Sequence, residues 1–153
     1  MEELNTNVKQ SFDEEFNLPV QKKFLSVMIH DKQWTLLNGL EVIKPEYFEN
    51  HYLQNICKWI RDYCKKHKAI PTQLVLKQKA EDLVNKYSLT PKEYFQYQQL
   101  IEEIFDVSES DDYEYFKEKA VTFAQTATWK AALYDATNCL KIHNYEEALN
   151  KFK

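Results

Sequence analysis

Hydrophobic residues return at helical intervals along almost the whole chain. The first apolar stripe follows Pro19, a favoured first helical position, and consists of Val20, Phe24, Val27 and Met28. Further stripes of the same period predict helices over about 19–30, 32–40, 50–66, 72–85 and 91–104. The one β-prone run, 74–76, has helical flanks. The pattern therefore predicts an all-α fold.

Capping residues mark where some of these helices begin. Thr72 is a candidate N-cap for the fourth helix, because its hydroxyl can accept a hydrogen bond from a first-turn amide. The run Thr90-Pro91-Lys92-Glu93 combines a cap, a proline at the first helical position and a glutamate that can complete a capping box. These signals predict helix starts at about 73 and 91.

The longest predicted helix, 111–142, carries two apolar stripes. The first consists of Phe116, Ala120, Phe123, Ala127, Ala131 and Tyr134. The second consists of Trp129, Leu133, Ala136 and Leu140. A helix at the edge of a monomer usually buries one face, so the second stripe predicts a contact between molecules. A last helix over 145–153 would complete a helical hairpin, a motif that often dimerises.

The 153 residues suffice for one domain, and the predicted elements divide it into three parts. We expect a flexible acidic tail over 1–17, a globular head of about five short helices over 18–107, and a helical hairpin over 108–153. The expected subunit interface lies on the hairpin and includes Phe123, Trp129, Leu133, Tyr134, Leu140 and Tyr145.

The chain contains a single glycine, Gly39, which the pattern places near the end of the second helix. Loops that hold nucleotide phosphates need several glycines, so that backbone amides can converge on the anion. Neither G-x-x-x-x-G-K-[ST] nor G-x-G-x-x-G occurs. Left-handed helix ends also favour glycine. We therefore expect function to come from helical surfaces and not from a nucleotide-binding loop.

The net charge of −4 conceals two oppositely charged segments. Residues 58–79 carry seven bases and one acid, and residues 102–118 carry eight acids and one base. Both segments are compatible with solvated helix faces, or with complementary surfaces that meet a partner or a neighbouring subunit. The candidate partner or phosphate contacts in the basic segment are Lys58, Arg61, Lys65, Lys66 and Lys68.

Candidate catalytic and metal-binding groups are sparse. The four histidines have no metal-ligand spacing, and paired carboxylates such as 102–103 and 111–112 lie in polar stretches. Cys57 and Cys64 are seven residues apart on the apolar face of a predicted helix, as expected for core packing. Trp34, Trp59 and Trp129 are candidates for base stacking, but their positions favour the core or an interface. We expect no catalytic, cofactor-binding or metal site in this chain.

The absence of recognisable targeting signals leads us to expect a cytoplasmic protein. The N-terminus has neither the basic nor the apolar segment of a signal peptide, and no apolar run approaches the roughly 18 residues of a membrane span. Three cysteines without ligand spacing are typical of reduced thiols. We therefore expect no contact with a membrane.

Several short runs follow one another in a recognisable order. The run 24–31 is an apolar helix that ends in an aspartate, and Trp34 and Leu37 follow it. The later runs are Ile43-Lys44-Pro45-Glu46-Tyr47-Phe48, Leu53-Gln54-Asn55-Ile56-Cys57 and His67-Lys68-Ala69-Ile70-Pro71-Thr72, and an acidic linker over 108–112 then precedes the long helix. In order and spacing, residues 18–153 resemble the N-terminal domain of DnaB-family replicative DNA helicases, most closely the phage branch typified by the T-even phage helicase. Ser26 and Thr72 stand where the bacterial family usually has Gly and Asp, which favours a phage or prophage relative.

The resemblance implies that copies of the hairpin pair, and that six domains form a collar above a ring of motor domains. Primase and the helicase loader act on this collar, and DNA is bound by the full-length ring. The motor, with its ATP and Mg²⁺, would follow residue 153. The implied function is a non-catalytic assembly and docking domain of a hexameric 5′-to-3′ helicase that unwinds duplex DNA at the fork, in the bacterial host cytoplasm.

Other functions stay open at this point. The helicase-binding domain of a primase resembles this fold, and it would be monomeric and bind a helicase collar. A stand-alone helical adaptor of the phage replisome is a third alternative, and an enzyme in its own right is a fourth. The coding sequence around this segment distinguishes them: a Walker A motif downstream supports a helicase, a primase domain upstream supports the primase, and a stop codon supports the adaptor.

Overall fold

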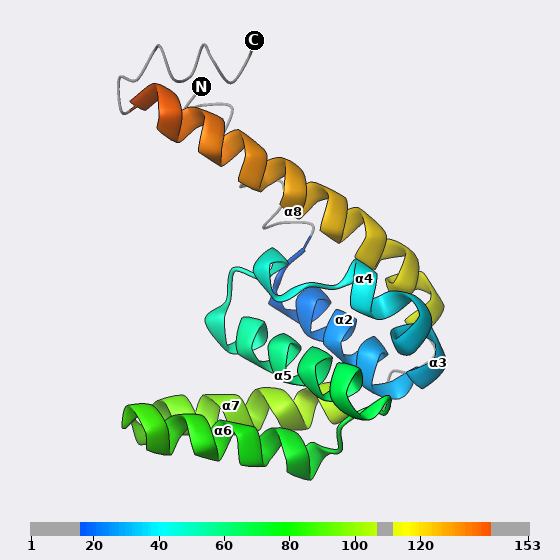
Figure 1. Ribbon diagram of the computed structural model, residues 1–153, viewed down its shortest axis with the longest axis vertical. Coiled ribbons are helices and arrows are strands. Elements are labelled where there is room, and N and C mark those ends of the chain that lie inside the picture. Colours follow the sequence, from blue (N-terminus) through cyan, green and yellow to red (C-terminus); the bar gives the residue numbers. More distant parts are fainter. Residues whose placement is uncertain (1–15, 107–111, 142–153) are drawn as a thin grey trace.

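The computed structural model describes residues 16–106 and 112–141 (Figure 1). Within these ranges every regular element is helical and no strand occurs, so the predicted all-α fold is confirmed. The elements are α2 (Leu18–His30), α3 (Lys32–Trp34), the π-helix η1 (Thr35–Gly39), α4 (Leu40–Val42), the 3₁₀ turn η2 (Pro45–Tyr47), α5 (His51–His67), α6 (Gln73–Tyr87), α7 (Pro91–Phe105) and α8 (Tyr113–Lys141).

Helix α2 lies at the centre of the head. It contacts α5, α7 and α8, while α6 and α7 pack side by side as the outer layer (Figure 1). Because α2 has neighbours on several sides, it buries an unbroken run from Phe24 to Ile29 instead of a single stripe. The core also includes Leu53, Ile56, Cys57, Ile60, Leu76, Tyr97, Leu100, Ile101 and Ile104.

The second predicted helix is longer and less regular than its pattern indicated. It runs from α3 through the π-helix η1 to α4, so Gly39 lies inside it and not at its end. The glycine has ordinary helical dihedral angles, with φ of −59°. A Cβ atom at this position would come within 2.9 Å of Cζ3 of Trp34. The only glycine of the chain therefore allows a close approach of the indole ring.

The two predicted caps are present, and a third occurs at α5. The side chains of Thr72 and Thr90 accept hydrogen bonds from first-turn amides of α6 and α7, and Asn50, which was not predicted as a cap, does the same for α5. Glu93 accepts a hydrogen bond from the Thr90 hydroxyl, whereas a complete capping box would use the Thr90 amide. The C-caps of α5 and α6 are left-handed, with φ of 54° and 52°, although no glycine occupies them. Two helices of this glycine-poor chain thus end in a left-handed residue that is not glycine, and the left-handed conformation costs about 1–2 kcal/mol for each such residue.

The N-terminal boundary of the head lies before residue 18. Asn17 caps α2, and Phe16 is completely buried, with its ring centroid 5.3 Å from that of Phe123. The prediction of a tail over 1–17 is therefore wrong for its last two residues, because Phe16 belongs to the core. The rest of that tail, 1–15, lies outside the described residues.

Helix α8 belongs to the head along its first half. Ala120 and Phe123 are completely buried, and the helix contacts α2, α4 and η2 before it continues beyond the head (Figure 1). The core of the head thus includes residues beyond position 107, where the sequence predicted the boundary between head and hairpin. The predicted last helix, 145–153, and most of the predicted linker lie outside the described residues, so the hairpin stays a prediction.

Candidate interaction surface on the long helix

The two apolar stripes of α8 lie on opposite sides of the helix, at about 100° per residue. The first stripe faces the head, where Phe123 lies close to four other aromatic rings, those of Phe16, Phe24, Tyr47 and Phe48. Its ring centroid lies 4.8 Å from Phe24, 5.2 Å from Phe48 and 5.3 Å from Phe16. Phe123 was expected at a subunit interface, but the structure places it in the core of the head. Because Phe123 lies on the side of α8 that faces α2, residues of the same molecule bury it and no second subunit is needed.

The second stripe lies on the part of α8 that leaves the head. Trp129 is 73% exposed, and Leu133 and Leu140 are partly buried. We call these three residues the distal stripe. Tyr134, which is 50% exposed, belongs to the other side of the helix, and Tyr145 lies outside the described residues. An exposed tryptophan that continues into further apolar side chains on the same side of a helix marks this side as a candidate interaction surface.

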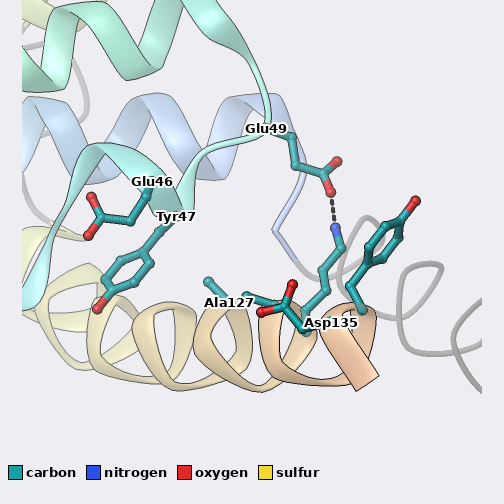
Figure 2. A pocket seen from close by; sticks show the side chains of 8 residues that line it. Glu46, Tyr47, Glu49, Ala127 and Asp135 are labelled. Carbon is teal, nitrogen blue, oxygen red and sulfur yellow. Dashed lines mark hydrogen bonds and ion pairs between the residues drawn. The ribbon is translucent and has the colours of Figure 1, made fainter. Parts of the chain in front are cut away.

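A groove of about 410 Å³ separates α8 from η2 and the turn that follows it (Figure 2). Its walls carry carboxylates and tyrosine rings, and alanines of α8 form its floor. The lining residues are Glu46, Tyr47, Glu49, Ala127, Lys130, Ala131, Tyr134 and Asp135. Lys130 donates a hydrogen bond to the Glu49 carboxylate across the groove (Figure 2). We call this the η2–α8 groove.

Arg61 has a structural role among the predicted phosphate contacts. Its guanidinium donates hydrogen bonds to the backbone carbonyls of Leu40 and of Ile43, the latter at 2.8 Å. It thus holds α4 and the residue that follows it against α5, and one guanidinium nitrogen is engaged within the head. The other members of the set, Lys58, Lys65, Lys66 and Lys68, are exposed.

The acidic segment is used largely within the head. Glu103 pairs with Lys22 at 2.5 Å, and Asp112 pairs with Lys23 at 2.8 Å, so these acids join the ends of α7 and α8 to α2. Lys117 of α8 pairs with Asp31 after α2. The hydrogen bond from Lys117 lowers the pKa of Asp31 and raises that of the lysine. Much of this charge therefore stabilises intramolecular contacts, and less of it is available to a partner.

The other candidate groups are placed in or near the core. Cys57 and Cys64 are buried, and burial raises the pKa of both thiols, so neither is a ready nucleophile. Trp34 and Trp59 are partly buried against the core. Within residues 16–106 and 112–141, no three His, Cys, Asp or Glu side chains are grouped to hold a metal ion. No helix in the same ranges is long and apolar enough to cross a membrane.

Comparisons with models of protein families, with curated proteins and with solved structures found no match. The resemblance to helicase N-terminal domains therefore rests on the sequence runs alone and stays a prediction. Sequence reasoning missed the η2–α8 groove. One signal was present, since Ala127 and Ala131 are two consecutive small residues of the first stripe, but only the fold brings Glu46 and Asp135 to the lining of the same groove (Figure 2).

Proposed function

We propose that this chain is a non-catalytic assembly and docking domain, the collar domain of a hexameric replicative DNA helicase. The observation that supports the proposal is the distal stripe: a well-packed head presents a long helix whose free part exposes Trp129. The ordered sequence runs support the more specific assignment to a helicase of the phage branch. Primase, helicase loader and other copies of the chain are the partners that this assignment proposes.

The size of the exposed side chain makes association through the stripe energetically reasonable. An aromatic side chain of this kind buries about 150–250 Å², so covering the 73% of Trp129 that is exposed contributes about 3–5 kcal/mol before association costs. Those costs offset a large part of the gain, and a stable dimer needs about 800 Å² on each partner. We therefore expect neighbouring residues of α8 to contribute to the same interface.

Multi-angle light scattering over a concentration series tests the proposal. We expect a dimer or a larger assembly, and we expect Trp129→Asp and Leu133→Asp to shift it toward monomer while the helical circular dichroism stays intact. Asn138→Asp is the matched control, because it adds the same charge to an exposed position on the opposite side of α8.

Two results would count against the proposal. An assembly that survives both substitutions in the distal stripe would place the interface elsewhere. A chain that is strictly monomeric at high concentration would favour the primase or adaptor functions. The helicase assignment has its own test, since it requires a nucleotide-binding motif in the coding sequence downstream of this segment.

A further inference from the structure

Helix α5 separates two regions of opposite charge. Glu46 and Glu49 lie just before its first residue and line the η2–α8 groove, together with Asp135 from α8 (Figure 2). At its other end, Lys65, Lys66 and Lys68 surround the last turn. We call these three lysines the basic end of α5.

The groove presents carboxylates that the described part of the chain does not neutralise. Lys130 pairs with Glu49, but neither Glu46 nor Asp135 forms an ion pair within residues 16–106 and 112–141. These two acids line the groove from different elements, and Tyr47 and Tyr134 line it as well. Carboxylates next to aromatic faces suit an ammonium group, which gains from both ion pairing and cation–π contact.

The basic end carries the complementary charge. Lys65, Lys66 and Lys68 are exposed, and none of them has a carboxylate partner among the described residues. Lys68 adopts a left-handed conformation with φ of 54°, which turns the chain away from the helix axis directly after the last turn. The lysines thus stand at a corner of the head, where a neighbouring molecule can reach them.

The two regions of one molecule cannot meet. Helix α5 has 17 residues, which corresponds to a length of about 25 Å, several times the reach of a lysine side chain. We propose that the basic end of α5 in one copy docks into the η2–α8 groove of the next copy, with separate lysine ammonium groups paired to Glu46 and to Asp135. A contact between different patches of identical chains repeats head to tail and closes into a ring where the rotation allows.

The inference deepens the proposed function, because it assigns a second self-association surface that is separate from the distal stripe. Charges at the ends of α5 also favour the helix dipole within a single molecule. That local effect changes the stability of the head but not its association, so the experiment must measure association directly.

Reciprocal charge reversal tests the docking. The groove variant is Glu46→Lys/Asp135→Lys, and the basic-end variant is Lys65→Glu/Lys66→Glu. By sedimentation velocity at low salt, we expect each variant alone to associate at least about tenfold more weakly than the unchanged chain, because like charges then face each other. An equal mixture of the two should recover association, since each variant then offers a complementary surface to the other. High salt should weaken the unchanged chain and the mixture alike.

Controls separate this contact from other effects. Lys79→Glu/Lys92→Glu makes the same change in net charge as the basic-end variant, at exposed positions outside both regions, and it should associate like the unchanged chain. If the single-sided reversals leave association unchanged, or if the mixture fails to recover it, the docking is refuted. The charges at the ends of α5 would then act on the helix dipole, or the groove would bind a basic partner other than this chain.

The outcome is independent of the test of the distal stripe. Association that is lost in Leu133→Asp but unaffected by charge reversal would refute the head-to-tail contact and leave the proposed function standing. Association that is lost on charge reversal but unaffected by Leu133→Asp would support the head-to-tail contact and count against an interface at the distal stripe. A chain that is monomeric at every concentration would overturn both.

Discussion

Replacement of Phe123 by alanine tests whether α8 is part of the head. The side chain is completely buried, and its ring lies within 5.3 Å, centroid to centroid, of Phe16, Phe24 and Phe48. These rings come from the segment just before α2, from α2 itself and from the turn before α5. The substitution therefore opens a cavity where four segments of the chain meet, and the surrounding rings can refill it only in part.

The expected loss is large compared with the stability of a domain of this size. Truncation of a buried phenylalanine costs about 3–5 kcal/mol, against a total of about 5–15 kcal/mol. The interlocked rings cannot collapse freely, which places the cost near the upper end of that range. Phe95→Ala is the control, because Phe95 is 63% exposed on α7, and we expect it to change the unfolding free energy by about 0.5 kcal/mol or less.

Urea unfolding followed by circular dichroism at 222 nm measures both variants, with the slope of the transition as a check that unfolding stays two-state. A loss for Phe123→Ala that is no larger than the loss for Phe95→Ala would refute the packing of α8 on α2. It would then return Phe123 to the set of surface residues from which the sequence had predicted a subunit interface.

Three further predictions follow from the site. Arg61→Met should destabilise the head by about 1–3 kcal/mol in urea unfolding, because two backbone carbonyls lose their charged donor, whereas Lys66→Met should be near neutral. Lys117→Met should remove about 0.5–1 kcal/mol at neutral pH. Because the folded-state pKa of Asp31 is lowered, that difference is present above the ordinary value of 3.8 and should fade in unfolding experiments as the pH drops below it. Ellman's reagent should label Cys139 in the folded protein, since its side chain is partly exposed, and the two buried cysteines only after unfolding.

The helices and their starts are what local sequence predicts best. The side chains of Asn17, Thr72 and Thr90 each accept a hydrogen bond from the backbone amide three residues further along the chain. A short segment of sequence therefore already encodes the cap. The second helix was predicted less completely. The pattern predicted it over 32–40 with Gly39 near its end, but it continues to Val42, and the ring of Trp34 packs on the glycine, a contact that a sequence pattern does not show.

The candidate site was predictable only in part. The exposure of Trp129 agrees with the stripe that predicted an interface, whereas Phe123 and Arg61 were assigned to surfaces and have structural roles. Periodicity shows that a helix has two apolar faces, but it does not show which face the rest of the chain covers. That choice depends on contacts between residues far apart in sequence.

The sequence by itself determined the helical class, most helix starts, the two stripes of the long helix and the absence of both glycine-rich phosphate-binding motifs. Each of these follows from spacing or residue type within a few turns of chain. The tertiary structure decided that the core extends from Phe16 into α8, that Phe123 of one stripe is buried whereas Trp129 of the other is exposed, and that Glu46 and Asp135 line the same groove. These features arise only when α2, η2 and α8 pack together, because burial and charge pairing depend on neighbours that the linear order does not specify.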